Sequence, residues 1–188
     1  KDTGIYMSIL INPNCLIEES LKITILTSVA VLSAIKSVYN LDVKLKWVND
    51  IILNDLKVGG ILCESQINLN NNIIDNMIVG IGINVKEFDF PPSLKNIATS
   101  IENNTNIKIS RNELISEIIN FFDLYFIDNK NYLNLYKENS YVLGKDITVI
   151  QNDRQFFAKA IDIEDNGALI VQEQEKIIKL ISSDISIR

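Results

Sequence analysis

The chain has 188 residues, 47% of them hydrophobic and 22% charged, so it carries enough apolar surface to fold around a core. Its formal net charge of -6 argues against non-specific binding to nucleic acid or anionic lipid, because both need an excess of Lys and Arg. The sequence contains no His, which excludes a Ser-His-Asp or Cys-His nucleophile and leaves Lys, Asp, Asn and backbone dipoles for any chemistry.

The cysteines and the apolar segments indicate the cellular setting. Cys15 and Cys63 show neither metal-ligand spacing nor a disulfide framework, so we expect a reducing cytoplasm. The most apolar long segment, residues 16–39, is interrupted by charged and hydroxyl residues, so we do not expect it to span a membrane. No signal peptide is visible, and a chain that starts at Lys1 rather than Met is expected to begin further upstream.

The first part of the chain predicts a strand, a helix and a second strand. Residues 3–11 alternate and are rich in Ile, and Asn-Pro-Asn ends the run. Residues 18–39 have apolar side chains at helical spacing on a wide face, which predicts a helix packed against a sheet. Residues 42–48 alternate again and predict a strand with Lys44 and Lys46 on its polar face.

The middle of the chain predicts a hairpin, a loop, a strand, a second loop and two helices. In order, these are residues 50–65 with a turn at 54–55, the Asn-rich tract 68–76, residues 77–85, the Pro-containing segment 90–101 leading into a short helical turn, residues 111–125 with Ser110 as N-cap, and a short helix ending at 137. After about residue 138 the sequence changes to short alternating strands with turns at 151–154, 165–167 and 173–175. This last pattern is typical of a small β-barrel.

Two pairs of glycines indicate places where something approaches a strand closely. In residues 77–85, Gly80, Gly82 and Asn84 share one face, which leaves a trough bare of side chains. In the hairpin, strict alternation predicts that Lys57 and Gly59 share a face with Ile61 and Cys63, so a cation would stand beside a second bare patch. An ammonium about 4 Å from an anion gains roughly 4 kcal/mol at an effective dielectric near 20. The alternatives are packing of another segment on bare backbone and an ordinary solvated lysine.

Polar residues at the end of strand 42–48 extend this pattern. Asn49 and Asp50 follow Lys46, and an Asp beside an Asn can hold a hydrated Mg²⁺, although both are also ordinary turn residues. Two lysines, a carboxylate, an Asn and two glycine troughs on neighbouring strands together suggest a groove for a nucleoside triphosphate and a second acid.

The motifs KWVNDI, KVGGILCE, VGIGINV and FPPSLKNIATSI, in this order and spacing, resemble the catalytic core of biotin protein ligases. The terminal segment GKDITVI to SDISIR is similar to the SH3-like domain of that family. The resemblance implies an α+β fold, in which a mixed β-sheet flanked by helices, of the class II aminoacyl-tRNA synthetase and biotin ligase type, precedes a small SH3-like β-barrel. It implies a catalytic domain at residues 1–137 and the SH3-like domain at 138–188.

The resemblance also implies the roles of individual residues. It implies catalytic roles for Lys57, Lys46 and Asp50, with Asp50 binding Mg²⁺. It implies that biotin is contacted by Lys57, Gly59, Gly60, Gly80, Ile81 and Gly82. It implies that ATP or the adenylate is contacted by Lys46, Asn49, Asn84, Phe88 and Arg188. Val48 stands where the family usually has Pro, and the Gly/Arg-rich segment that covers biotin in the family is not found in this sequence and would precede residue 4.

The activity implied is ATP-dependent conversion of biotin to biotinyl-5'-AMP, followed by transfer of biotin to a lysine of a biotin carboxyl carrier domain. A lipoate or octanoyl ligase of the same fold and a non-catalytic protein that binds biotinyl adenylate are the alternatives. We expect no nucleic-acid partner for this chain and no membrane, and the family contains both monomers and homodimers.

Overall fold

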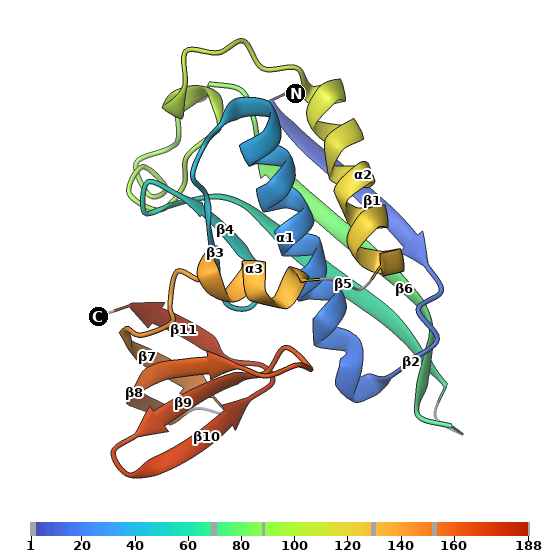
Figure 1. Cartoon of the computed structure of the whole chain (residues 1–188). Helices are drawn as coiled ribbons and strands as arrows, with labels where there is room; N and C mark the ends of the chain where they lie inside the picture. Colours follow the sequence, from blue (N-terminus) through green and yellow to red (C-terminus); the bar gives the residue numbers. More distant parts are fainter. Residues whose placement is uncertain (1–2, 69–70, 88, 129–130, 152–153, 188) are drawn as a thin grey trace.

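The computed structural model describes residues 3–68, 71–87, 89–128, 131–151 and 154–187. Its helices and strands form two sheets with helices packed on the larger one (Figure 1). In chain order the elements are β1 Gly4–Ile11, β2 Cys15–Leu16, η1 Ile17–Glu19, α1 Ser20–Tyr39, β3 Lys44–Lys46, β4 Asp50–Leu53, β5 Leu56–Asn68, β6 Ile73–Asn84, η2 Glu102–Asn104, α2 Arg111–Asp128, α3 Tyr132–Glu138, β7 Asp146–Gln151, β8 Arg154–Ile163, β9 Leu169–Glu173, β10 Lys176–Leu180 and β11 Asp184–Ile187.

The larger sheet has six strands in the order β1-β6-β5-β4-β3, and β2 pairs with the far end of β6. Its ladders are antiparallel, and among the described residues parallel pairing is limited to the isolated bridges Leu45↔Ser140 and Lys57↔Ala98. Helix α1 packs on this sheet and α2 packs against α1 (Figure 1). The predicted α+β class is confirmed.

Helix α1 supplies the centre of the core. Thirteen of its residues are buried, and the hydroxyls of Thr27 and Ser28 donate to the carbonyls four residues earlier, which satisfies them without water. The helix ends at Asn40, whose left-handed backbone and N–H bond to the Lys36 carbonyl (3.0 Å) form a C-cap. By length and composition residues 17–39 could cross a membrane, but 67% of the most apolar window is buried inside this protein, as expected of a core helix.

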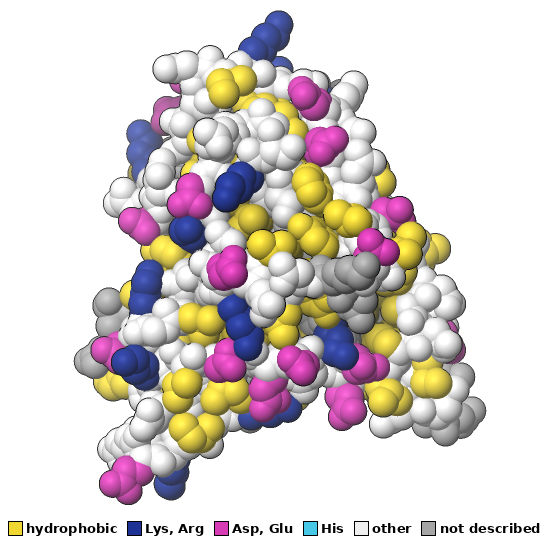
Figure 2. Space-filling model, in the orientation of Figure 1, with side chains coloured by type: hydrophobic (Ala, Val, Ile, Leu, Met, Phe, Trp, Pro, Cys, Tyr) yellow, Lys and Arg dark blue, Asp and Glu magenta, His cyan; other side chains and the backbone are white. Residues whose placement is uncertain are grey.

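The two faces of the larger sheet differ in what covers them. On β6, Met77, Val79, Ile81 and Ile83 point into the core beneath the helices. We call the opposite face the open face; on it the Tyr6 residue is 79% exposed to solvent and several aliphatic side chains are exposed as well. Figure 2 views the molecule from the helix side, where Lys, Arg, Asp and Glu side chains are interspersed rather than gathered by sign. The open face is therefore the side of the larger sheet that α1 and α2 leave uncovered.

The second sheet has five antiparallel strands in the order β10-β9-β8-β7-β11 and fits the predicted SH3-like unit. Its predicted turns fall between β7 and β8, β8 and β9, and β9 and β10. The domain boundary near residue 138 remains a prediction; that residue ends α3, and the second sheet begins at Asp146.

Two predicted segments differ from the structure. The strand predicted over residues 42–48 is confined to β3, because residues 47–49 turn the chain into β4. The Asn-rich tract is not simply a loop: β5 continues to Asn68 and β6 starts at Ile73, and these two residues pair. A long hairpin with many cross-strand bonds overrides the low strand propensity of Asn. Helix α2 begins as predicted, with the Ser110 hydroxyl accepting from the Glu113 amide at 3.3 Å.

Candidate active site

One row of residues crosses the open face from edge to edge. The registers of the four strand pairs align Tyr6, Gly82, Gly60, Asp50 and Lys46. Directly opposed residues on antiparallel strands share a face, so the two glycines form a floor without side chains. We call this floor, with Gly80 on the next row, the trough. An aromatic ring bounds it at one end, and a carboxylate and an ammonium bound it at the other.

A β-bulge brings Lys57 into this row. Ile51 pairs with Gly59 and Ile52 pairs with Lys57, so Val58 is an extra residue on β5. Val58 and Gly59 both face the core as a result. The Lys57 side chain instead lies across Gly60: a Cβ added at Gly60 would be 3.5 Å from the Nζ of Lys57. The prediction from strict alternation, that Lys57 shares a face with Gly59, Ile61 and Cys63, is therefore wrong.

Lys57 is held in place from its backbone and from its side chain. Its amide donates to the Ile97 carbonyl at 2.8 Å, and its carbonyl accepts from the Thr99 amide at 2.9 Å. The ammonium forms an ion pair with Asp50, whose side chain is 22% exposed against 45% for that of Lys57. The two charged groups thus stand together at one end of the trough, still open to an entering anion.

Gly59 on β5 and Gly82 on β6 differ in the space around them, and a pair of substitutions can separate their roles. An added Cβ at Gly59 would lie 2.6 Å from the backbone oxygen of Gly82, so we expect Gly59→Ala to lower the free energy of unfolding by about 1–3 kcal/mol. At Gly82 the nearest atom would be 3.8 Å away, so Gly82→Ala should cause no such loss. Urea unfolding followed by circular dichroism measures both, and equal stability of the two variants would contradict the bulged register.

A cleft of about 470 Å³ adjoins the Asp50 end of the row. It is bounded on one side by residues 46–50 and on the other by the C-terminal sheet, through Ile150, Gln151 and residues 182–185. Within the described part of the chain, the Lys46 ammonium has neither a hydrogen bond nor an ion pair. A free cation at the wall of a cleft is suited to binding an anion.

Asn49 and Asn84 are engaged in holding the backbone. The side-chain Nδ2 of Asn49 donates to the Ile61 carbonyl at 2.9 Å, and the backbone carbonyl of Asn49 accepts from the Ile61 amide at 2.9 Å. Asn84 donates to the Thr99 carbonyl at 3.1 Å. These contacts fix the turn before β4 and the segment that supports Lys57. Their predicted roles at ATP or the adenylate remain predictions.

The remaining predicted site residues fall into three groups. Gly80 and Gly82 lie on the open face as predicted, whereas Ile81 is buried beneath the helices, so it could offer a ligand only its backbone. Phe88 and Arg188 lie outside the described residues. Tyr6 was not predicted from the sequence, since its place beside Gly82 depends on the pairing of β1 with β6.

The fold and this row define a class of protein: an α+β domain with a glycine-floored trough on the open face of its sheet, followed by a small all-β unit. Two family models match the chain, "Biotin/lipoate A/B protein ligase family" over residues 1–84 and "Biotin protein ligase C terminal domain" over residues 142–188. The chain belongs to the biotin protein ligase family.

Individual relatives agree with this assignment. The bifunctional ligase/repressor BirA of Bacillus spizizenii is 32% identical over 194 residues, which cover 100% of this chain and 59% of BirA. The biotin protein ligase of Aquifex aeolicus superposes with a TM-score of 0.84 at 25% identity, covering 100% of this chain and 84% of that one. A structure of that protein with biotin and ATP, 22% identical to this chain (TM-score 0.84; 100% of this chain and 80% of that one), shows the common fold. The chain thus spans 59% of the length of the BirA relative.

Proposed function

We propose that the protein activates biotin with ATP to form biotinyl-5'-AMP and then transfers biotin to a lysine of a biotin carboxyl carrier domain. The observation that carries this proposal is the row across the open face, in which a glycine floor ends at the paired Lys57 and Asp50. Family membership supports biotin in particular, because the C-terminal match is to a biotin protein ligase model.

The trough suits the apolar body of biotin. A bicyclic ring can lie on bare backbone at Gly82 and Gly60, with the Tyr6 ring as a wall, and each buried CH₂ contributes about 0.8 kcal/mol. The acid chain would then point toward Lys57, whose ammonium lies over Gly60. The carboxylate is ionised at neutral pH, so no general base is needed for it to attack phosphorus.

The first step forms a bond between a carboxylate oxygen and the α-phosphorus of ATP and breaks the bond to the β-phosphate, releasing pyrophosphate. Bringing two anions together is an electrostatic and positioning task, which Lys57 and Lys46 serve from two sides. In the second step the acceptor amine attacks the acyl carbon, loses a proton, and AMP leaves. The cleft beside Lys46 is where we place the phosphates.

Asp50 is the residue that we propose to hold Mg²⁺. Its ion pair with Lys57 uses Oδ1, which leaves Oδ2 for an ion. Within the described residues no group of three His, Cys, Asp or Glu side chains comes together, so the protein would supply one carboxylate and leave the other positions to water and phosphate oxygens, as Mg²⁺ usually accepts. When bound, the ion would neutralise charge on the phosphates.

The test is exchange of labelled pyrophosphate into ATP by the full-length protein, with biotin, lipoate or octanoate as the acid. We expect exchange with biotin alone, and transfer of biotin to a purified carrier domain when one is added. Exchange that required lipoate or octanoate would favour the other ligases of this fold. Binding of biotinyl adenylate without any exchange would show a binding protein instead of an enzyme.

A further inference from the structure

The loop between β8 and β9, residues 164–168, connects the C-terminal sheet to the candidate site. The indole N–H of Trp47 donates to the Gly167 carbonyl at 3.0 Å, and both residues are buried. Trp47 lies between Lys46 and the rest of the turn that leads into β4. A residue of the second sheet therefore contacts the turn that carries the cleft's cation.

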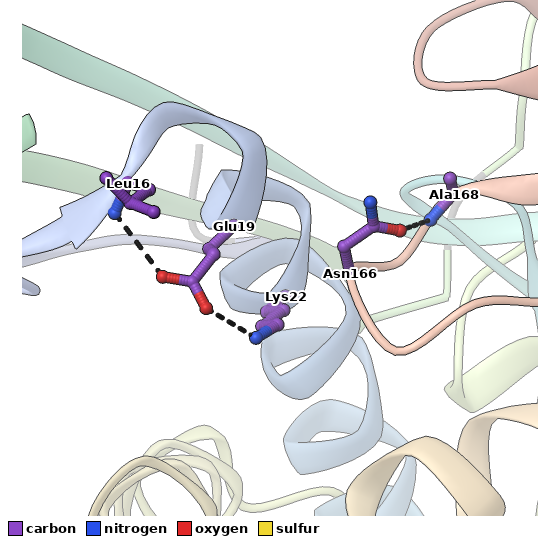
Figure 3. Close-up of polar contacts among 5 residues, drawn as sticks. All are labelled: Leu16, Glu19, Lys22, Asn166 and Ala168. Atoms are coloured by element: carbon purple, nitrogen blue, oxygen red, sulfur yellow. Dashed lines mark hydrogen bonds and ion pairs between the residues drawn. The ribbon is translucent and has the colours of Figure 1, made fainter. Parts of the chain in front are cut away.

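Gly167 can make this contact because it has no side chain. Its φ is +88°, and an added Cβ would lie 2.9 Å from the Cβ of Leu21 and 3.2 Å from Ile25. Figure 3 shows the loop, with Asn166 and Ala168, beside the first turns of α1. The Asn166 side chain accepts from the Ala168 amide at 3.1 Å, and this bond shapes the loop. The carbonyl that meets Trp47 is thus fixed between α1 and the turn.

Three more hydrogen bonds hold β3 and the turn after it from the segment before the second sheet. Leu45 donates to the Asn139 carbonyl at 2.9 Å and accepts from the Tyr141 amide at 2.8 Å. The hydroxyl of Tyr136, which is fully buried on α3, donates to the Val48 carbonyl at 3.4 Å. Burial, and to a lesser degree the charge of Asp50, raises the pKa of Tyr136, so this hydroxyl keeps its proton.

We propose that the β8–β9 loop positions the nucleotide side of the site through the bond between Gly167 and Trp47, with Gly167 as a positioning residue outside the cleft and Trp47 as the residue of the turn that it holds. This inference rests on the proposed function in placing the ATP phosphates beside Lys46. Its consequence is selective: moving the loop shifts the turn of residues 46–50 and leaves the trough, which is built on β5 and β6, in place. Nucleotide binding should weaken while biotin binding stays the same.

The chain offers a matched pair of variants for the test. Gly167→Ala and Gly144→Ala both place a side chain at a positive φ, +88° and +78°, but an added Cβ at Gly144 meets nothing within 4 Å. We expect Gly167→Ala to raise the KM for ATP at least about tenfold, since a displacement of about 1 Å can cost a hundredfold in rate. Its biotin affinity should stay within about twofold of wild type. Gly144→Ala should change neither.

Two further measurements keep the test independent of catalysis. Calorimetric titration with a non-hydrolysable ATP analogue gives nucleotide affinity directly, and the emission of Trp47, the one tryptophan of this sequence, should shift to the red in Gly167→Ala. If that variant does not fold, Trp47→Phe keeps an aromatic side chain at the buried position while removing the N–H donor together with the five-membered ring of the indole, and the same loss of nucleotide affinity is expected.

The outcomes separate this inference from the proposed function. A folded Gly167→Ala or Trp47→Phe with wild-type nucleotide affinity would overturn the positioning role, and so would an equal loss of biotin affinity. A wild-type protein that binds the analogue but shows no biotin-dependent exchange would overturn the proposed function alone. A wild-type protein that binds no nucleotide would overturn both.

Discussion

Replacing Lys57 with alanine is expected to lower the rate of biotin-dependent ATP–pyrophosphate exchange at least about a hundredfold. Enzymes lose rate on this scale when a hydrogen-bond donor to the negative charge that develops in the transition state is removed. The ammonium lies over the glycine floor and beside Asp50, where the acid and the α-phosphate are proposed to meet. Exchange of labelled pyrophosphate by the full-length variant measures the effect.

A second lysine provides the control for this prediction. Lys44 lies on the same face of the sheet, opposite Ile52, and pairs with the exposed Asp42 at 3.1 Å, away from the trough. Lys44→Ala removes the same charge and should leave exchange within about threefold of wild type. Near-normal exchange by a folded Lys57→Ala protein would remove Lys57 from the mechanism.

Filling the trough is expected to abolish biotin binding. In Gly82→Val the added atoms occupy the floor between Tyr6 and Gly60, and since the closest contact of a Cβ there is 3.8 Å, the strand should accept the substitution. We expect biotin affinity to fall more than about a hundredfold, or about 2.7 kcal/mol, when measured by calorimetry.

Asn76→Val is the matched control for that experiment. Asn76 lies on the same strand and face but pairs with Gln66, several residues along β6 from the row. A valine there should leave biotin affinity unchanged. If Gly82→Val bound biotin as well as Asn76→Val does, the ligand would have to lie elsewhere on the protein.

The parts of the fold that follow regular periods could be predicted from the sequence. From Met77 to Asn84 strand β6 alternates regularly, so the opposite orientations of Ile81 and Gly82 follow from period two alone. Helix α1 could also be predicted, because its apolar residues recur at helical spacing throughout, and so could the hairpin turn at residues 54–55. The α+β class follows from these elements and from the alternating strands of the second sheet.

The parts that depend on pairing could not be predicted in this way. A bulge such as that at Val58 leaves no mark in the hydrophobic pattern, because Val is ordinary in a strand, yet it decides which face Lys57 occupies. Tyr6 enters the site only through the ladder between β1 and β6. The hydrogen bond from Trp47 to Gly167 joins residues 120 positions apart in the sequence, so no local sequence pattern predicts it.

The bulge and the strand pairing beside it also limit how this hairpin tolerates insertions and deletions. Asp50 and Lys57 are seven positions apart, and that interval is filled by two strand segments, the two-residue turn at Asn54 and Asp55, and the pairing of Leu53 with Leu56. A residue added or removed within either strand segment would carry the ammonium to the opposite side of the sheet, since adjacent strand positions face opposite ways. The strand segments of this hairpin must therefore keep their length for the carboxylate and the ammonium to meet, whereas its two-residue turn can lengthen.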